Sequence, residues 1–288
     1  MKRTYIESHI FKAFSKMNGI IPQDEAGIIL SGLVFIKLYS SETWKKLKEL
    51  NDYSINLYIH DFFTNEKLPF NRIYDFKELD SKLLKALIII LDEADISIRG
   101  DVLGEIYNFC KSDDNRKIYG EHYTPYNVVK LLLNALDIKE DDILLDPCAG
   151  TGRMLTVAKK TFPFRNITFI GQEKNPIAWT LAQMSAFLYN MDLKIGNSPQ
   201  DALQKILGIS VEHVLMNPPF NQSYAQDLEI NSQIWDETTC RRSNLNFSWL
   251  QLALHYIKEN GDAAVITSNL FINAEKRRYC CKTDDYRK

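Results

Sequence analysis

The stretch DILLDPCAGTGRM, residues 142–154, joins a short apolar run to a turn with two glycines and the start of a helical pattern. Gly150 and Gly152 let the backbone approach a ligand closely, and the first turn of a helix offers N–H groups to it. A dinucleotide fingerprint requires a third glycine at position 155, where this sequence has leucine. A phosphate cradle requires Lys and Ser or Thr after the glycines, and the sequence lacks that pair. The stretch therefore predicts either a plain strand-to-helix turn or a site for a nucleoside without phosphates.

Short apolar runs alternate with helical patterns from about residue 142 onward. The runs are DILLD, ITFIG, LKIGN, HVLMN and AAVITS. The helical patterns between most of them are TGRMLTVAKKTF, PIAWTLAQMSAFLYN, PQDALQKIL and NFSWLQLALHYIKEN. This alternation predicts a parallel sheet, in which ligands bind beyond the carboxyl ends of the strands. Asp146, Glu173, Asn197 and Asn217 each lie at or just past the end of a run, so we expect them at one edge of the sheet.

Glu173 ends the second apolar run, about twenty residues beyond the glycines. An acid at this place accepts hydrogen bonds from the hydroxyls of a ribose. Because the turn is not built for phosphates, the pair of features favours S-adenosylmethionine, which consists of adenine, ribose and a charged amino-acid end.

The segment GEHYTPYNVV, residues 120–129, precedes the first run of the sheet. Thr124 suits a helix cap and Pro125 suits the first helical position. The segment is either an ordinary capped helix or a helix start that lies beside the glycine turn, where its N–H groups could hold a carboxylate.

The run HVLMN is followed by two prolines and a phenylalanine, giving NPPF at residues 217–220. Neither proline can donate to the ladder of a sheet, so the segment predicts a stiff turn at a strand end. It is either a turn with a buried aromatic ring or a site that holds one amide and one ring in fixed positions.

The first part of the chain has a different pattern, in which apolar residues recur every three or four positions. The clearest segments are IESHIFKAFSKM, DEAGIILSGLVFIKLYS and KELDSKLLKALIIILDEAD. We therefore expect a helical domain over residues 1–115, with a role in packing or docking, and an α/β domain over residues 116–288.

Bulk composition excludes several classes of protein. The 288 residues are 45% hydrophobic and 25% charged, as in ordinary globular proteins, and no apolar run approaches the length of a membrane span. The N-terminus lacks the apolar core of a signal peptide, and five cysteines without metal or disulfide spacing indicate free thiols, so we expect a cytoplasmic protein without a metal. A net charge of −2 means that any DNA contact requires a local basic patch or a basic partner.

The ordered set of motifs is similar to that of the amino-group DNA methyltransferases, and most of all to the modification (M) subunit of type I restriction systems. The motifs are GEHYTP, DPCAGTGRML, GQEKNPIAWTLAQM, NPPFNQS and NFSWLQLALHYIKENGDAAVITSN, within about residues 100 to 275. The resemblance implies a Rossmann-like class I methyltransferase sheet preceded by a helical domain. It also implies transfer of a methyl group from S-adenosylmethionine to the N6 amine of an adenine flipped out of double-stranded DNA.

The resemblance implies a role for each matching residue. The methionine end of the cofactor would be lined by Glu121, His122, Tyr123, Thr124, Pro125 and Tyr126, and wrapped by Asp146, Ala149, Gly150, Thr151, Gly152 and Arg153. Glu173 would hold the ribose, Pro176 would lie near the adenine ring, and Asn197 stands where the family often has an acid near that ring. The catalytic segment that receives the target adenine would be Asn217, Pro218, Pro219 and Phe220.

The chain departs from the family after Ser268-Asn269, where YCCKTDDYRK replaces the helix and strands expected next. We therefore expect a sheet without its final strands and a methyltransferase domain truncated at its C-terminus. Since the sequence shows no target-recognition domain, the resemblance implies a separate specificity (S) subunit and, in complete systems, a restriction (R) subunit.

Two other hypotheses stay open on the sequence alone. Enzymes that methylate glutamine in proteins also use NPP-type motifs on an amide nitrogen. A catalytically inactive assembly subunit that binds only the cofactor would carry the same motifs.

Overall fold

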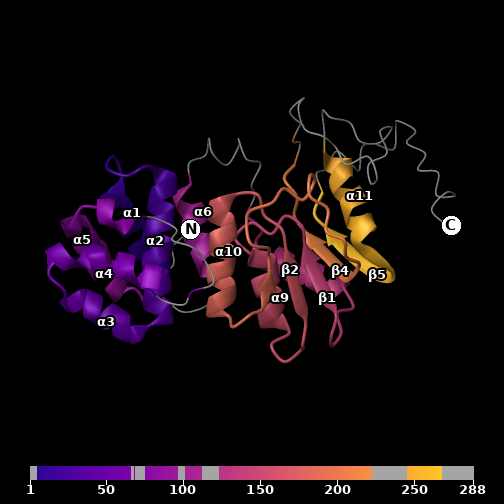
Figure 1. Ribbon diagram of the computed structural model, residues 1–288, viewed down its shortest axis with the longest axis horizontal. Coiled ribbons are helices and arrows are strands. Elements are labelled where there is room, and N and C mark those ends of the chain that lie inside the picture. Colours follow the sequence, from indigo (N-terminus) through magenta and orange to yellow (C-terminus); the bar gives the residue numbers. More distant parts are fainter. Residues whose placement is uncertain are drawn as a thin grey trace.

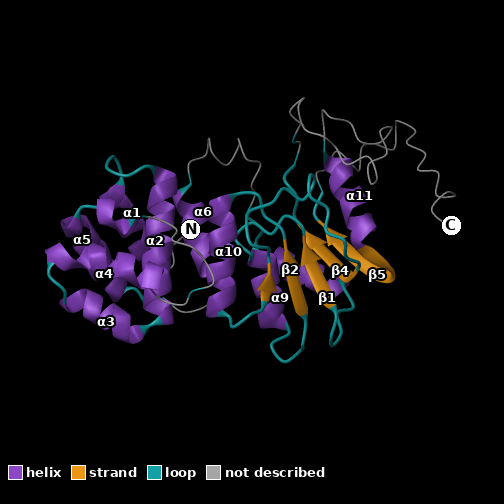
Figure 2. Cartoon of the chain, in the orientation of Figure 1, coloured by secondary structure: helices purple, strands orange, loops and turns teal. Residues whose placement is uncertain are grey.

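The computed structural model describes residues 5–65, 68, 75–96, 101–111, 123–220, 222 and 245–267. Helices gather at one end of the molecule and a sheet lies at the other (Figure 1). Helices α6 (Val102–Cys110) and α10 (Pro176–Leu188) lie between the two parts. Figure 2 shows the same division, with the strands confined to one side of α10.

The helical part is built around α2. Its elements are α1 (Tyr5–Met17), α2 (Gln23–Tyr39), α3 (Ser41–Glu49), α4 (Asp52–Asn65), the 3-10 helix η1 (Phe76–Glu78), α5 (Ser81–Glu93) and α6. Every residue of α2 from Ala26 to Ile36 is buried, as expected of a helix that is apolar on nearly all sides. The helices predicted around 6–17 and 24–40 are confirmed. The one predicted over 77–95 is divided, because η1 ends at Glu78 and the Asp80 side chain caps α5.

The second part contains a parallel sheet with the strand order β3-β2-β1-β4-β5. The strands are β1 (Ile143–Asp146), β2 (Thr168–Gly171), β3 (Leu193–Lys194), β4 (Val211–Met216) and β5 (Ile257–Val265). All four pairs of neighbours are parallel, with β1 between β2 and β4. The predicted parallel sheet is thus confirmed. The strands expected to be missing concern residues beyond 267, which lie outside the described part of the chain.

Helices cover both faces of the sheet. Leu144 and Leu215 pack with α8 (Tyr126–Ala135) and α9 (Arg153–Thr161) in one core cluster. Leu145 and Val214, which point the other way, pack with α11 (Asn246–Tyr256) in another.

Helix α10 joins the sheet to the helical part. Leu181 and Met184 belong to the core of the helical part, whereas Trp179 and Ala182 pack against the sheet side. Because one helix contributes to both cores, the two parts share a common apolar boundary.

Two sequence predictions fail within the sheet part. PQDALQKIL, residues 199–207, forms turns and no helix. Asp201 caps a single turn through its side chain, and the carbonyl of Lys205 accepts from Gln172 Nε2 rather than from a helical neighbour.

Helix α11 ends at Tyr256, so residues 257–260 belong to β5 and not to the predicted helix. Gly261 lies within this strand, where a Cβ would lie 2.6 Å from the backbone oxygen of Glu212 on β4.

A buried histidine on β4 contacts carboxylates on both sides of its strand. His213 on β4 is 5% exposed, and its Nε2 lies 2.8 Å from Asp142 Oδ2 while its Nδ1 contacts Asp262 Oδ1. The contact therefore links β4 to the residue before β1 and to β5.

The described cysteines and helices bear on two further expectations. Cys110 and Cys148 are free thiols, as predicted, while the other three cysteines lie outside the described residues. Among the helices of the described ranges, none has the length and apolarity that crossing a membrane requires.

Candidate active site

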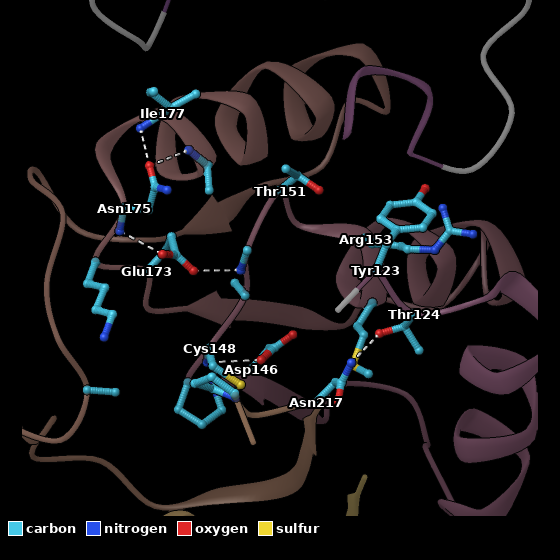
Figure 3. A pocket seen from close by; sticks show the side chains of 18 of the residues that line it. Tyr123, Thr124, Asp146, Cys148, Thr151, Arg153, Glu173, Asn175, Ile177 and Asn217 are labelled. Carbon is cyan, nitrogen blue, oxygen red and sulfur yellow. Dashed lines mark hydrogen bonds between the residues drawn. The ribbon is translucent and has the colours of Figure 1, made fainter. Parts of the chain in front are cut away.

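A cavity of about 560 Å³ opens at the carboxyl ends of the strands. Asp146 at the end of β1, Glu173 just past β2 and Asn217 just past β4 all line it. Figure 3 shows Glu173 and Asn217 on two sides of this cavity, with Asp146 and Cys148 between them. The predicted meeting of these side chains at one edge is therefore confirmed for three of the four residues.

The glycine turn wraps around one side of the cavity. Gly150 and Gly152 have φ values of +56° and +80°, which side chains disfavour. A Cβ on Gly152 would also lie 3.2 Å from the Cα atom of Ala182 on α10. Gly152 thus satisfies both a left-handed backbone and a close approach to a neighbouring helix.

The carboxylate of Glu173 connects the glycine turn to the start of the next helix, α10. Its Oε2 accepts from Gly150 N at 2.8 Å, and its Oε1 accepts from Asn175 N at 2.7 Å (Figure 3). The Asn175 side chain in turn caps α10 by accepting from Ile177 N at 2.9 Å. Glu173 is therefore oriented before any ligand binds.

Asp146 is almost completely buried beneath the cavity. Burial raises its pKa to about 7. The charge of Glu173 also raises this pKa, whereas the hydrogen bonds from Cys148 lower it. The backbone N–H of Cys148 donates to Asp146 Oδ1 at 3.0 Å. Burial and the nearby carboxylates also raise the pKa of the Cys148 thiol, so this cysteine stays neutral.

Asn217 and Thr124 are joined across the cavity. Asn217 Nδ2 donates to Thr124 Oγ1 at 2.9 Å, which fixes the plane of the amide group (Figure 3). The prediction that Thr124 caps a helix with Pro125 at its first position is wrong. Pro125 is itself the cap residue of α8, no side chain caps that helix, and the hydroxyl of Thr124 serves Asn217 instead.

The side chain of Arg153 points toward the helical part. Its guanidinium lies over the ring of Tyr123, 3.9 Å from the centroid, and donates to Glu105 Oε1 at 3.0 Å. Thr151 in the glycine turn donates to the buried carboxylate of Asp101, the cap residue of α6. Both contacts fasten the glycine turn to α6.

Most of the predicted site residues line the cavity. These are Tyr123, Thr124, Asp146, Ala149, Gly150, Thr151, Arg153, Glu173, Pro176, Asn217 and Pro219. Pro125, Tyr126, Gly152, Asn197, Pro218 and Phe220 are not among the lining residues. Glu121 and His122 lie outside the described residues.

The geometry does not support a cofactor contact for Asn197, which is exposed. Gly196 has a φ of +76°, and the chain then turns so that Gln200 N donates to the backbone oxygen of Glu173 at 2.7 Å. Gln200 and Asp201 line the cavity instead. A carboxylate, that of Asp201, thus borders the cavity four residues beyond Asn197.

Two groups of lining residues were missed by the sequence analysis. Trp249 comes from α11, and within the described residues its buried indole N–H has no hydrogen-bond acceptor. The other group comes from the helical part and consists of Asp24, Tyr107, Asn108 and Lys111. No motif marks this second group, because tertiary docking brings it to the cavity.

The comparison with protein families decides the relationship. The model of the N-6 DNA methylase family matches residues 98–279, more than half of the chain. The chain belongs to the N-6 DNA methylase family. Its resemblance to type I modification subunits is confirmed as well by the curated relatives.

Among those relatives is the type I restriction enzyme MjaVIII methylase subunit of Methanocaldococcus jannaschii. It is 27% identical over 223 residues, which cover 70% of this chain and 38% of that protein. The HindI methylase subunit of Haemophilus influenzae is 25% identical over 182 residues, covering 59% of this chain and 40% of that protein. This chain thus matches well under half of the length of either relative.

A solved structure confirms the fold class. The crystal structure of a type I restriction-modification methyltransferase subunit from Streptococcus thermophilus superposes with a TM-score of 0.62 and 16% identity. The match covers 91% of this chain and 74% of that one. This N-6 DNA methylase thus has the predicted methyltransferase-like sheet preceded by helices.

Proposed function

We propose that the chain binds S-adenosylmethionine and positions an adenine of DNA for methylation at N6, as part of a type I modification subunit. The observation that carries the proposal is that Glu173 and Asn217 face one cavity from the ends of β2 and β4. Family membership supports the same chemistry. In this proposal residues 1–115 form the helical domain and residues 116–288 the methyltransferase domain.

The residues that line the cavity fit this cofactor. A volume of about 560 Å³ lies in the usual range for cofactor sites. Glu173 is already oriented by two backbone N–H groups, and each oxygen of a carboxylate can accept more than one hydrogen bond, which suits it to ribose hydroxyls. Pro176 and Asp201 would contact the adenine end, and the backbone of the glycine turn would follow the other end. Asp146 supplies negative charge beneath a cofactor that carries a positive sulfonium.

When bound, the cofactor supplies a methyl group on a positively charged sulfur. The chain's own contribution is to hold the amine that receives it. The exocyclic amine of adenine is a weak nucleophile, because its lone pair is delocalised into the ring. The side-chain oxygen of Asn217 and the backbone carbonyl of Pro218 can accept both of its N–H groups, which favours a pyramidal nitrogen.

The neighbours of Asn217 keep this clamp rigid. Thr124 fixes the amide plane through a bond of 2.9 Å, and the two prolines restrict the backbone that follows. Positioning of this kind supplies much of the catalysis in a transfer between aligned groups. Phe220 would stack on the base and contribute about 1–3 kcal/mol. Because base pairing hides the amine, the adenine must be flipped out of the duplex.

The partners of the proposed enzyme are double-stranded DNA, a specificity subunit and, in complete systems, a restriction subunit. A net charge of −2 supports DNA binding with the help of another subunit, since DNA binding by one chain alone usually rests on a surplus of basic residues. We propose the cytoplasm, where the DNA is found, as the location.

Transfer of a tritium-labelled methyl group from S-adenosylmethionine to duplex DNA tests the proposal. The assay is run with the chain alone and with a specificity subunit, and the DNA is digested to nucleosides. We expect label in N6-methyladenine. Label in protein glutamine, or cofactor binding without transfer in the presence of the specificity subunit, would contradict the proposal.

A further inference from the structure

Tyr123 and Thr124 lie between the amide of Asn217 and the helical part of the chain. Thr124 Oγ1 accepts from Asn217 Nδ2 at 2.9 Å, and Tyr123 is the residue before Thr124. Figure 3 shows Tyr123 and Thr124 together on the side of the cavity where Asn217 lies. Because the peptide group between the two residues is planar, a fixed ring at Tyr123 restricts where the Thr124 hydroxyl can lie.

The ring of Tyr123 lies against the guanidinium of Arg153. The Cζ atom of Arg153 is 3.9 Å from the ring centroid, well within the range of a cation–π contact. Arg153 begins α9 directly after the glycine turn and is 7% exposed, so its side chain has little room to move. The ring is therefore held against the first residue of α9.

Helix α6 contacts both members of this stack. Arg153 Nη1 donates to Glu105 Oε1 at 3.0 Å, and the hydroxyl of Tyr123 donates to the backbone oxygen of Asp101 at 3.4 Å. Glu105 lies in the first turn of α6, and Asp101 is the cap residue of that helix. Since the side chain of Asp101 also accepts from Thr151, the start of α6 is fixed to the glycine turn from which Arg153 follows.

We propose that Arg153 and Tyr123 are positioning residues for methyl transfer, which transmit the docked position of α6 to Thr124 and thereby orient the amide of Asn217. The inference rests on the proposed function, which gives that amide the task of holding the adenine amine. An amine held for transfer in a straight line is sensitive to small displacements of the group that holds it. The helical part then contributes to catalysis through α6, beyond packing or docking.

Glu105 is the outermost member of this chain of contacts. Its side chain is 51% exposed and does not line the cavity. A change at Glu105 therefore reaches the reaction through Arg153 and not through a direct contact with cofactor or base. Tyr123, in contrast, lines the cavity, so its test must separate positioning from direct contact with the cofactor.

A double-mutant cycle between Tyr123→Leu and Thr124→Val makes this separation. The kcat of methyl transfer to duplex DNA is measured with the specificity subunit present, and S-adenosylhomocysteine affinity is measured by calorimetry. We expect Tyr123→Leu alone to lower kcat about 10- to 100-fold while this affinity stays within about threefold. In the Thr124→Val background, where the hydroxyl is already absent, Tyr123→Leu should lower kcat by less than about threefold.

Conservative and remote variants complete the design. Tyr123→Phe keeps the ring on Arg153, so its kcat should stay within about threefold of the unaltered chain. Glu105→Ala should lower kcat about two- to fivefold, as for the loss of a half-exposed ion pair, and should have no effect in the Thr124→Val background. Glu49→Ala is a matched control, because Glu49 is an exposed glutamate on α3 that does not line the cavity, and it should leave kcat unchanged.

Urea denaturation identifies the variants that fold, and Glu105→Ala carries the same cycle if Tyr123→Leu does not. An equal loss of kcat in both backgrounds, or a loss of S-adenosylhomocysteine affinity as large as the loss of kcat, would overturn the inference and leave the proposed function standing. Failure of the unaltered chain to methylate DNA in the presence of the specificity subunit would overturn the proposed function, and the inference with it.

Discussion

The substitution Asp101→Asn tests how the helical part holds the glycine turn. Asp101 is 0% exposed, and its Oδ1 accepts from Gly104 N at 2.8 Å and from Ser185 Oγ at 3.1 Å. Its Oδ2 accepts from the hydroxyl of Thr151. Asparagine has nearly the same shape, keeps an oxygen for the first two donors and offers an N–H₂ group to the Thr151 hydroxyl, which can rotate to accept. The substitution therefore removes the charge and preserves the contacts.

The magnitude follows from the pKa of Asp101. Burial raises it from 3.8 to about 6, although the bonds from Thr151 and Gly104 and the charge of Arg153 oppose the rise. A rise of about two pH units corresponds to about 3 kcal/mol of folding free energy. Since the folded pKa is the higher one, this stability is fully present below about pH 3.8 and is lost as the pH rises through about 6. Asparagine has no such dependence.

Urea denaturation of both proteins at about pH 4.5 and about pH 7.5 measures the effect. Between these values the stability of Asp101→Asn should rise by about 2 kcal/mol relative to the unaltered chain, because part of the loss already occurs below the lower pH. Taking the difference cancels the titration of all other groups. A stability difference that is equal at both pH values would refute the assignment of a buried, ionising Asp101.

Four further results are expected. Glu173→Ala should weaken S-adenosylmethionine about 100-fold, because it removes a carboxylate whose hydrogen bonds are worth about 1.5–3 kcal/mol each; a change under about threefold in calorimetry would contradict this role. Asn217→Ala should abolish methyl transfer while cofactor affinity stays within a few fold, and a large loss of affinity would show that Asn217 acts on the cofactor. Binding of the positively charged cofactor should lower the pKa of Asp146 from about 7 and release a proton, so that affinity rises from pH 6 to pH 8 and the binding enthalpy depends on the buffer; an enthalpy that is the same in all buffers would exclude this. His213→Ala should lower the unfolding free energy by about 2 kcal/mol, because the Asp142 and Asp262 carboxylates each lose a hydrogen-bond partner, and an unchanged urea midpoint would show that the contact is not stabilising.

Sequence reasoning succeeds where a rule of chain geometry applies. Glu173 and Asn217 end parallel strands, and parallel strands bring their carboxyl ends to one edge, so their meeting at the cavity follows from the pattern. The glycine turn follows similarly, since Gly150 and Gly152 adopt the backbone that only glycine tolerates well.

The failures come from contacts between distant residues. PQDALQKIL has helical periodicity, but Gln172 and Tyr256 capture the Lys205 carbonyl and the Leu207 N–H in its last turn. Thr124 suits a cap by local rules and instead serves Asn217, 93 positions away. Lys111 lines the cavity only because α6 docks there, and no local pattern records a docking of this kind.

Calorimetric titration of the unaltered chain with S-adenosylmethionine tests most directly whether the cavity between Glu173 and Asn217 is a cofactor site. We expect saturable binding at one site per chain. Prior addition of S-adenosylhomocysteine should abolish this binding. Absence of saturable binding by the folded chain up to roughly millimolar cofactor would contradict it.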